Sequence, residues 1–248
     1  MEPEEYSLIA DVEGHHWWHK GLRNRVIAEL KGLVYEGIFI LDAGCGTGGT
    51  VASFRACFPS ATVVGVDFSP IALLHAKKKA GGQLTLGNVN TLPFADASFD
   101  IITALDVIYH AEIDEDHAFK EFMRIIKPGG KLLVNVPAYE WLRSDHDVVV
   151  HTARRYTVGK LRAKACEAGF GIVGCGYRNS LLFPLMVMQR ITRRIWKSSS
   201  PKSAVIQHWG PVNVLLSIVL ALENLLLSRG LKFWAGGSVF AVLKKPSP

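Results

Sequence analysis

The chain has 248 residues, of which 49% are hydrophobic and 20% are charged, and this balance excludes a disordered protein. Its length can bury a full core in one large domain or in two small ones. The net charge of +6 is uneven, because residues 181–233 hold seven Lys and Arg against Glu223 alone and so account for the whole excess. This distribution disfavours a uniformly basic nucleic-acid-binding protein and predicts a local basic and apolar surface.

The N-terminus and the cysteines indicate a cytoplasmic protein. The first residues, "MEPEEY", are acidic and lack the apolar run of a secretory signal. Cys45, Cys57, Cys166 and Cys175 form no CxxC pair, so we expect reduced thiols and neither a disulfide framework nor a zinc site.

Before any strand signal the chain reads "EGHHWWHKG", with three histidines and two adjacent tryptophans. No carboxylate or cysteine stands at a suitable spacing from His15, His16 and His19, and neighbouring side chains of a helix point to different faces. We therefore predict no metal here. Trp17 and Trp18 are open to two interpretations, as core residues or as a cover over a ligand.

Short apolar runs alternate with helical periodicity, which predicts a parallel sheet covered on both faces. Turn signals such as "KPGG" and the N-terminal Pro70 of one helix mark the element ends. Two apolar helical stretches precede the last strand. The predicted strands lie in 38–41, 62–69, 84–89, 99–110, 131–137, 171–177 and 237–245. The predicted helices cover 22–33, 51–58, 70–80, 114–126, 157–170, 181–196 and 214–227.

The glycine-rich turn "LDAGCGTGG" directly follows the first strand. Glycines let the backbone approach a ligand, and the next helix presents free N–H groups there. The spacing also fits the GxGxxG pattern of nicotinamide and flavin sites, and a tight turn without a ligand is a further alternative. Asp42 before the glycines would repel a pyrophosphate but could accept hydrogen bonds from a cationic amino acid. Asp67, after the second strand, suits ribose hydroxyls in either kind of site.

Four stretches, "ILDAGCGTG", "VVGVDFSP", "LGNVNTLPFADASFDIITALDVIYH" and "EFMRIIKPGGKLLVNVPA", together resemble class I S-adenosylmethionine-dependent methyltransferases, in particular the methyltransferase type 11 group. The resemblance runs from about Leu33 to Pro137. It implies an α/β, Rossmann-like seven-stranded sheet of order 3-2-1-4-5-7-6, with the last strand antiparallel and helices on both faces. It also implies S-adenosyl-L-methionine as cofactor and S-adenosyl-L-homocysteine as product.

The resemblance further implies roles for individual residues. The glycines would approach the methionine part and Asp42 would orient its ammonium group. Asp67 would hold the ribose, Phe68 would lie against the adenine, and Asn88 stands where the family usually has Asp. The segment before the first strand resembles the "HWW…R" stretch of a bacterial subgroup and would form a lid, with Arg23 or Arg25 near the cofactor carboxylate. The predicted cofactor-binding residues are Trp17, Trp18, Asp42, Gly44, Cys45, Gly46, Gly48, Asp67, Phe68, Asn88, Val89 and Leu105.

The domain organisation we expect is a single methyltransferase domain over 1–248. Residues 1–33 would form the helical lid, and residues 34–180 with 237–245 the core sheet. Residues 181–236 would be a basic, apolar insertion that serves as core, homodimer interface, lid or peripheral membrane contact.

Methyl transfer from a sulfonium is an in-line displacement that needs a base only when the acceptor carries a proton. His110, at the carboxyl edge of the sheet, is the first candidate base, or else a histidine that caps the next helix. The loop "AYEWLRSDHDVVVHTARRY" is polar and aromatic, as functional loops often are. From it and its surroundings we predict His151 and Tyr156 as catalytic and Tyr109, His146, Arg154 and Arg155 as substrate-binding, although the two arginines also fit a solvated basic turn.

The function we expect is methyl transfer to a small-molecule acceptor, hydrophobic or lipid-linked, with no metal and no nucleic acid. The (N/D)PP(Y/F) signature of amino-methylating DNA enzymes is absent from the sequence. Two alternatives remain at this point: a non-catalytic S-adenosylmethionine-binding protein of the same fold, and a nicotinamide-dependent oxidoreductase.

Overall fold

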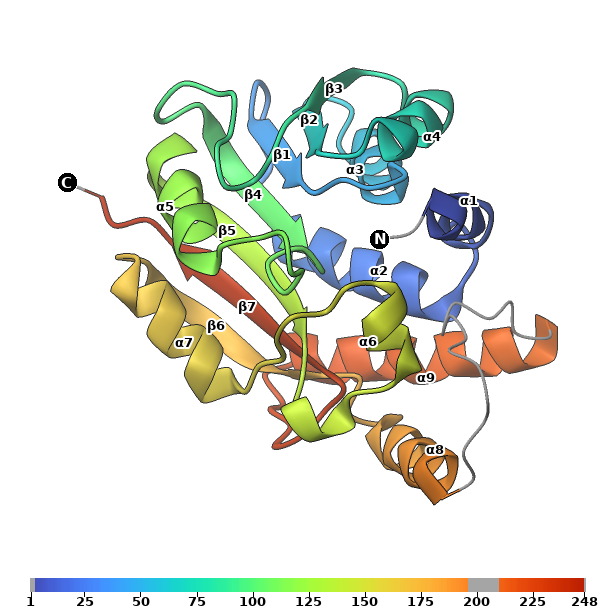
Figure 1. Cartoon of the computed structure of the whole chain (residues 1–248). Helices are drawn as coiled ribbons and strands as arrows, with labels where there is room; N and C mark the ends of the chain where they lie inside the picture. The colour runs from blue at the N-terminus through green and yellow to red at the C-terminus, as the bar shows by residue number, and fades with distance from the viewer. Residues whose placement is uncertain (1–2, 196–209, 248) are drawn as a thin grey trace.

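The computed structural model describes residues 3–195 and 210–247, which form one seven-stranded sheet with helices on both faces (Figure 1). The strand order β3-β2-β1-β4-β5-β7-β6 and the antiparallel pairing of β7 with β5 and β6 confirm the predicted fold. The strands are β1 Phe39–Ala43, β2 Thr62–Asp67, β3 Gln83–Leu86, β4 Phe99–Leu105, β5 Ile126–Pro137, β6 Gly171–Arg178 and β7 Ser238–Lys244.

The helices begin where the sequence supplies side-chain caps. Ser69, Asp114 and Thr157 each accept a hydrogen bond from a backbone N–H in the first turn of the helix that follows. The helices are α1 Pro3–Val12, α2 Trp17–Leu30, α3 Gly49–Cys57, α4 Pro70–Ala80, α5 Glu115–Ile125, α6 Asp145–Val149, α7 Val158–Glu167, α8 Phe183–Ile195 and α9 Gly210–Ser228.

Two buried clusters hold these layers together, one on each face of the sheet. On one face Phe119 and Phe122 of α5 and Leu161 of α7 pack against the strands. On the other face Val26 of α2 and Phe54 of α3 do the same. Because both faces are buried, the central strands are almost continuously apolar, as parallel sheets require.

Two strand ends differ from the predicted limits by five residues, and the other ends differ by three or fewer. β4 ends at Leu105 rather than continuing to His110, because Asp106 has a φ of 60° and turns the chain out of the sheet. β5 begins at Ile126, since the "KPGG" turn forms an irregularity inside the strand, where the pairing with β4 shifts register. The first difference has a consequence for the site, because it places residues 106–110 beyond the sheet edge.

Helix α9 packs against α2 across a glycine. A Cβ on Gly21 would lie 2.5 Å from Cδ1 of Leu220, so only glycine lets the two helices approach this closely. Asn213 and Asn224 of α9 donate hydrogen bonds to the carbonyl oxygens of His15 and Gly21. The inward face of α9 is therefore the one that carries its polar side chains.

Candidate active site

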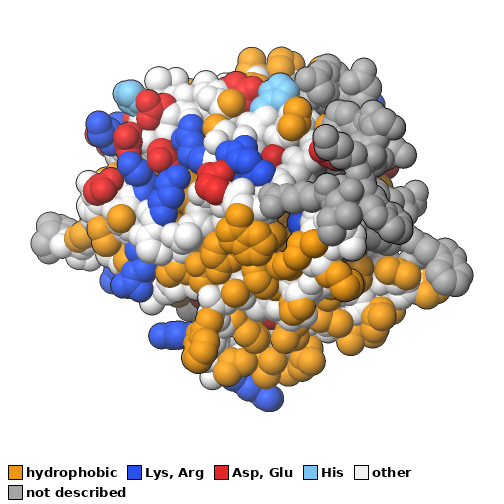
Figure 2. Space-filling view, turned by 60° about the horizontal axis from the view of Figure 1, so that its bottom comes forward, with side chains coloured by type: hydrophobic (Ala, Val, Ile, Leu, Met, Phe, Trp, Pro, Cys, Tyr) orange, Lys and Arg blue, Asp and Glu red, His pale blue; other side chains and the backbone are white. Residues whose placement is uncertain are grey.

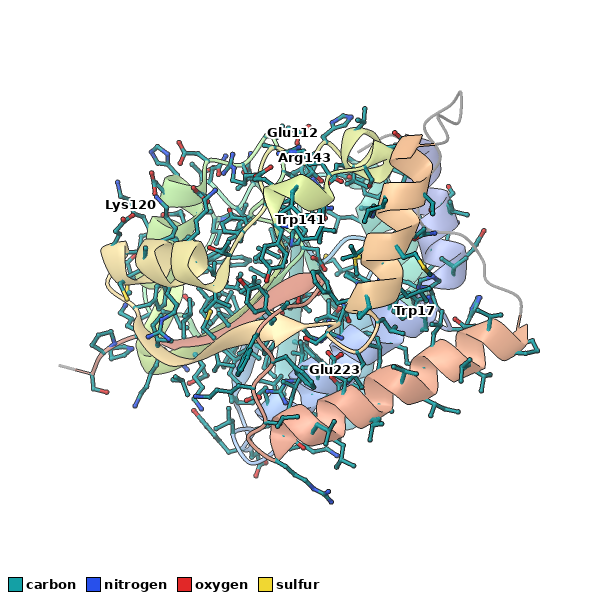
Figure 3. All side chains as sticks on the ribbon, turned by 90° about the horizontal axis from the view of Figure 1, so that it is seen from below. Trp17, Glu112, Lys120, Trp141, Arg143 and Glu223 are labelled. Atoms are coloured by element: carbon teal, nitrogen blue, oxygen red, sulfur yellow. The ribbon has the colours of Figure 1, made fainter. Side chains whose placement is uncertain are left out.

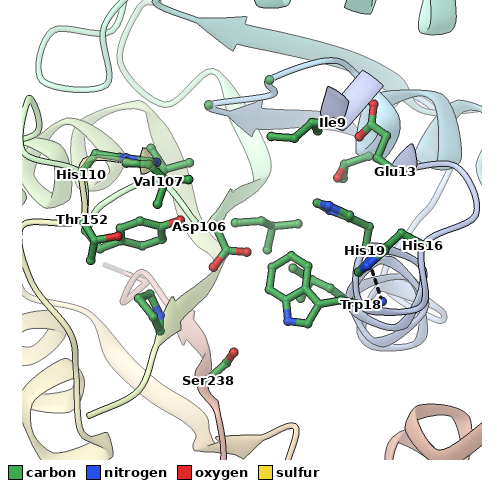
Figure 4. Close-up of a pocket in the computed structure, with 18 of the residues that line it drawn as sticks. Ile9, Glu13, His16, Trp18, His19, Asp106, Val107, His110, Thr152 and Ser238 are labelled. Atoms are coloured by element: carbon green, nitrogen blue, oxygen red, sulfur yellow. Dashed lines mark hydrogen bonds between the residues drawn. The ribbon is translucent and has the colours of Figure 1, made fainter. Parts of the chain in front are cut away.

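A cavity of about 650 Å³ opens at the carboxyl ends of β1, β2 and β4, which is where open α/β sheets bind ligands (Figure 4). Helices α1 and α2 cover one side of it, and α8 and α9 contribute to its far wall. Its volume lies in the range of small-molecule and cofactor sites.

The glycine loop, residues 44–49, forms one end of the cavity. Gly44 and Gly46 have φ values of 75° and 53°, and both line the cavity. A Cβ on Gly44 would lie 2.3 Å from Cγ2 of Val107, so this position requires glycine for packing as well as for conformation. Cys45 also lines the cavity, and burial raises the pKa of its thiol, which leaves it a neutral wall residue.

Gly48 has a different role from the one we predicted. It does not line the cavity, and its φ of 85° places it at the N-terminal end of α3. A Cβ there would lie 2.8 Å from the Cα and Cβ of Ala76, so the glycine allows α3 to pack against α4. The absence of a side chain at Gly48 therefore serves the packing of α3 against α4 and not the binding of a ligand.

Asp67 and Phe68 lie at the rim of the cavity. Asp67 is buried, and its two carboxylate oxygens accept hydrogen bonds from the N–H groups of Gly46 and Ser69, at 2.8 and 2.9 Å. Each oxygen keeps a further acceptor site for a ligand hydroxyl. The ring of Phe68 is half exposed, and Val89 is buried beside it in the lining.

Asn88 is placed differently from our prediction. Its side chain is exposed and does not line the cavity, whereas its neighbours Gly87 and Val89 do. The Oδ1 atom of Asn88 accepts a hydrogen bond from the N–H of Asn90 at 2.9 Å, so the amide stabilises the turn after β3.

Carboxylates dominate the polar lining near the glycine loop. Asp42 is buried and accepts a hydrogen bond from the hydroxyl of Thr103 at 2.6 Å. Burial raises the pKa of Asp42 to about 7, and the nearby charges of Asp67 and Glu13 add to the effect. Glu13 comes from the turn between α1 and α2. A Cβ on Gly49 would lie 2.2 Å from Oε2 of Glu13, so this carboxylate sits against the N-terminal turn of α3.

This arrangement favours one of the two cofactor classes. A pyrophosphate would bind at the N-terminus of α3, where the carboxylate of Glu13, paired with Lys79, already occupies the space beside Gly49. A ligand that carries positive charge would instead favour the ionised forms of Asp42 and Asp67. The geometry therefore disfavours a dinucleotide and fits a cationic ligand with a ribose.

Comparison with known proteins agrees with this geometry. Residues 41–134 match the model of a family described as a methyltransferase domain. The demethylmenaquinone methyltransferase of Lactobacillus johnsonii is 38% identical over 120 residues, which cover 45% of this chain and 48% of the relative. The sterol 24-C-methyltransferase of Aspergillus fumigatus is 33% identical over 119 residues, which cover 45% of this chain and 30% of the relative. The chain thus spans about half the length, or less, of these curated relatives.

A solved structure extends the likeness of fold beyond the matched segment. Haemonchus contortus phosphoethanolamine N-methyltransferase 2, in complex with S-adenosyl-L-methionine, superposes with a TM-score of 0.59 and 19% identity. The match covers 90% of this chain and 52% of that one. Residues 41–134 thus match the methyltransferase-domain family, and the chain shares its overall fold with an S-adenosylmethionine-binding methyltransferase.

The residues of the cavity fit S-adenosylmethionine, the cofactor bound in that solved structure. S-Adenosylmethionine carries a sulfonium and an ammonium group, and the cavity places Asp42 and Glu13 close to the glycine loop. Asp67 has acceptor capacity for ribose hydroxyls, and the half-exposed ring of Phe68 offers a face to an adenine. Leu105, at the end of β4, lines the cavity as predicted.

The N-terminal helices cover the cofactor end of the cavity, as the lid prediction requires. Trp17 and Trp18 both line the cavity, and Trp18 also packs against the buried cluster on its face of the sheet. The two interpretations of the tryptophans are therefore compatible. Figure 4 shows the Trp18 ring directed toward Asp106. Arg23 lines the cavity, whereas Arg25 turns away to pair with Glu29 and to lie over the ring of Phe240.

Several residues of this lid were not predicted from the sequence. Tyr6 and Ile9 of α1 line the cavity, and so does His16, which caps α2. Glu13 accepts a hydrogen bond from Thr47 of the glycine loop and pairs with Lys79 of α4. No local pattern in the sequence links these positions, because the contacts join distant segments.

The segment after β4 presents Asp106, Tyr109 and His110 to the cavity. In Figure 4 Asp106 points into the middle of the space, between the lid and Ser238 of β7. Its carboxylate accepts a hydrogen bond from Nδ2 of the buried Asn135 at 3.0 Å, and burial raises its pKa to about 7. We did not single out Asp106 from the sequence, although it is the first residue past a buried strand at the ligand edge.

His110 is held in one tautomer. Its Nδ1 lies 2.7 Å from the carbonyl oxygen of Val150. A carbonyl can only accept, so Nδ1 carries the proton and Nε2 is unprotonated in the neutral ring. Burial lowers the pKa of His110, which keeps the ring neutral at pH 7. The ring also lies beside that of Tyr109, with centroids 4.4 Å apart and the two planes tilted by 32°.

Two of the three predicted catalytic residues lie outside the cavity. Tyr156 is 1% exposed, packs in the core and donates a hydrogen bond from its hydroxyl to Glu115. His151 lies on an outer surface, where Nδ1 is 3.0 Å from Oε1 of Glu112. Neither lines the cavity, so a direct catalytic role for them is not supported.

The predicted substrate-binding residues of the same loop are also engaged elsewhere. Arg154 donates to the carbonyl oxygen of Ile113 and does not line the cavity. Arg155 does line it, but its guanidinium is bidentate with Asp147, at 2.9 and 3.0 Å. This buried pair fixes the loop over the cavity. His146 belongs to α6, and its side chain lies outside the described part of the structure.

Within residues 3–195 and 210–247, no group of three or more His, Cys, Asp or Glu side chains has an arrangement that could hold a metal ion.

Proposed function

We propose that this chain transfers a methyl group from S-adenosylmethionine to a small apolar acceptor. The single observation that carries the proposal is the division of the cavity into two chemically different ends. The glycine-loop end carries Glu13, Asp42 and Asp67, and the far end is walled mainly by apolar side chains, with Gln189 and Arg190 of α8 beside them.

The far wall consists of residues from the two helices between β6 and β7. Leu182, Leu185 and Met186 of the α8 region and Leu216 of α9 line it, with Ser238 of β7 at the edge. Apolar lining of this kind stabilises an apolar ligand by removing its surface from water, at roughly 25 cal/mol per Å². The names of two relatives refer to demethylmenaquinone and sterol, which are apolar molecules, and this supports the same class of acceptor.

The cofactor, when bound, supplies a methyl group already activated on a sulfonium. The residues of the chain then have three tasks. The lid excludes water, with Trp17 and Trp18 over the cavity. Nε2 of His110 can accept a proton if the acceptor is a hydroxyl or an amine. Asp106, oriented by Asn135, can bind a donor group of the acceptor.

A radiochemical assay tests the proposal. The protein is incubated with S-adenosylmethionine labelled in the methyl group and with demethylmenaquinol, a sterol or phosphoethanolamine, and the label is followed into organic and aqueous phases. We expect label in an organic-phase product that Met186→Asp reduces, while Val173→Asp, an exposed apolar position on β6 outside the cavity lining, does not. Transfer to phosphoethanolamine alone would contradict an apolar acceptor. Cofactor binding without transfer to any of the three would favour the non-catalytic alternative.

A further inference from the structure

The outer surface of α8 and α9 carries a large set of exposed apolar side chains, which we call the α8–α9 face. In Figure 2, where the bottom of Figure 1 is turned forward, hydrophobic side chains gather over one half of the surface, next to a region of mixed acidic and basic side chains. Figure 3 shows α8 and α9 as the helices nearest the viewer on this side. The exposed apolar residues of the face are Leu185, Met188, Ile191, Val212, Val214, Leu215, Ile218, Leu222 and Leu225.

The orientation of α9 is the reverse of that of an ordinary surface helix. Its polar residues Asn213, Glu223 and Asn224 face the protein, where they bind the backbone of α2 and of residues 179–181. Leu215 and Ile218, which are 61% and 60% exposed, face outward. Water disfavours this orientation, whereas a hydrocarbon environment favours it.

The charged residues around this face indicate which kind of partner covers it. The one acidic residue of 181–233, Glu223, is fully buried, so its carboxylate contributes nothing to the surface. Arg229 and Lys232 are exposed just beyond the C-terminal end of α9. Trp234 nearby is 94% exposed, and tryptophan is enriched where hydrocarbon meets water. An apolar surface flanked by basic residues and an exposed tryptophan matches an anionic lipid surface.

Two residues belong both to this face and to the wall of the cavity. Leu185 of α8 and Val212 of α9 are both exposed to solvent, at 53% and 40%, and both line the cavity. An apolar molecule in a bilayer against this face could therefore pass between the two helices without crossing water.

By length and composition, α9 is apolar enough to cross a membrane. Crossing would withdraw the Glu223 carboxylate from the three N–H groups that it binds, those of Asn179, Ser180 and Leu181. It would also break the contacts of Asn213 and Asn224 with α2. Lying in the plane of the interface keeps all of these bonds.

We propose that the α8–α9 face docks the protein on an anionic lipid bilayer, with α9 in the plane of the interface and the cavity entrance facing the hydrocarbon. The uptake of the acceptor from the bilayer rests on the proposed function. The docking does not, because it needs neither cofactor nor acceptor.

Vesicle flotation of the full chain tests the docking. We use vesicles of phosphatidylcholine alone and vesicles in which about a third of the lipid is phosphatidylglycerol. Wild-type protein should float with the anionic vesicles at low salt and less as salt rises. Leu215→Glu with Ile218→Glu should weaken binding by about tenfold or more, since two apolar contacts are lost. Arg229→Glu with Lys232→Glu should remove the preference for anionic vesicles.

A matched control uses exposed apolar residues elsewhere. Leu74 of α4 and Val173 of β6 are 63% and 57% exposed, so Leu74→Glu with Val173→Glu adds the same charge away from the face and should leave flotation unchanged. All variants are compared for S-adenosylhomocysteine binding, which the face substitutions should not alter. Failure of wild-type protein to float at low salt would overturn the proposal. The proposal would also be overturned if the Leu215→Glu, Ile218→Glu variant floated like wild type and differed only in size-exclusion chromatography, as a monomer where wild type is a dimer.

A lack of methyl transfer in the radiochemical assay, with flotation intact, would overturn the proposed function and leave the docking standing.

Discussion

The carboxylate of Glu13 accepts a hydrogen bond from the hydroxyl of Thr47, and this contact joins the lid to the glycine loop. The same carboxylate pairs with Lys79 of α4. Lid, loop and α4 therefore meet at one buried group beside the N-terminus of α3. We infer that a cofactor bound at the glycine loop is also in contact with the lid, so lid substitutions should alter cofactor affinity.

Trp18→Ala should weaken the binding of S-adenosylhomocysteine by about tenfold, because it removes an aromatic wall of the cavity and admits water. Isothermal titration calorimetry measures the effect, and Trp18→Phe should restore most of the affinity. Trp141 is half exposed and lies outside the cavity lining, so Trp141→Ala is the control. Equal affinity in Trp18→Ala and in wild type would show that the ring serves the core alone.

Asp42→Asn should stabilise the cofactor-free protein above pH 7 and weaken cofactor binding. Burial raises the folded-state pKa of Asp42 from 3.8 to about 7, so the folded protein binds more protons than the unfolded chain between these values. Stability from this group is therefore present at low pH and is lost as pH rises toward 7. Urea unfolding at pH 8 should show a gain of about 2 kcal/mol in the variant.

At pH 4 the same variant should gain much less, because Asp42 is then protonated in the folded protein. A variant that is no more stable than wild type at pH 8 would argue against a buried, destabilised carboxylate at this position.

His110→Gln should leave S-adenosylhomocysteine affinity unchanged and slow turnover by about 10²-fold with an acceptor that must lose a proton. Burial lowers the pKa of His110, so in wild type the ring is a neutral base at pH 7 and its rate contribution falls only at a pH below the ordinary range of histidine. The variant should lack this acid limb in its pH–rate profile. Full turnover in His110→Gln would remove His110 from the chemistry.

Glu223→Ala should destabilise the fold by about 3–5 kcal/mol in urea unfolding. The carboxylate accepts hydrogen bonds from the N–H groups of Asn179, Ser180 and Leu181, at 2.6, 2.7 and 2.9 Å. It also supplies negative charge near Arg178, which is fully buried and has no hydrogen-bond partner for its guanidinium among the residues that the structure describes.

The control for this prediction is Glu29→Ala, which removes a partly exposed carboxylate paired with Arg25 on α2. That change should cost about 1 kcal/mol or less. Similar costs for the two glutamates would mean that the buried network around Arg178 contributes little.

Features with a local cause were predictable from the sequence. The strands of the sheet are continuous apolar runs, and the glycine loop follows the first of them, so the sheet and the position of Asp42 and Asp67 could be predicted. The strand order was predicted from the resemblance to the methyltransferase family and not from these runs. Helix starts at Ser69 and Thr157 follow from side-chain caps. Each of these features depends on residues within a few positions of one another.

Features that depend on long-range contacts could not be predicted. Glu13 meets Thr47 and Lys79, which are 34 and 66 positions away, and nothing in its local sequence indicates a carboxylate of the site. Tyr156 and His151 stand in a loop of the expected composition, but packing turns the first into the core and the second outward. Composition locates such a loop, whereas tertiary packing decides which of its side chains reach the cavity.

The orientation of α9 is another example. Its composition fits a core helix, an interface helix or a membrane helix equally well. Only the contacts of Asn213, Glu223 and Asn224 show that the polar side faces inward. The close approach of Gly21 to Leu220 then determines which side is left exposed.

The central claim is that the acidic end of the cavity binds S-adenosylmethionine and not a dinucleotide. Isothermal titration calorimetry of the full chain with S-adenosylhomocysteine and with NAD tests it most directly. The account predicts micromolar binding of S-adenosylhomocysteine and no binding of NAD. It also predicts that Asp67→Ala abolishes the first, while Asp116→Ala, a surface change on α5, does not. Binding of NAD without binding of S-adenosylhomocysteine would contradict it.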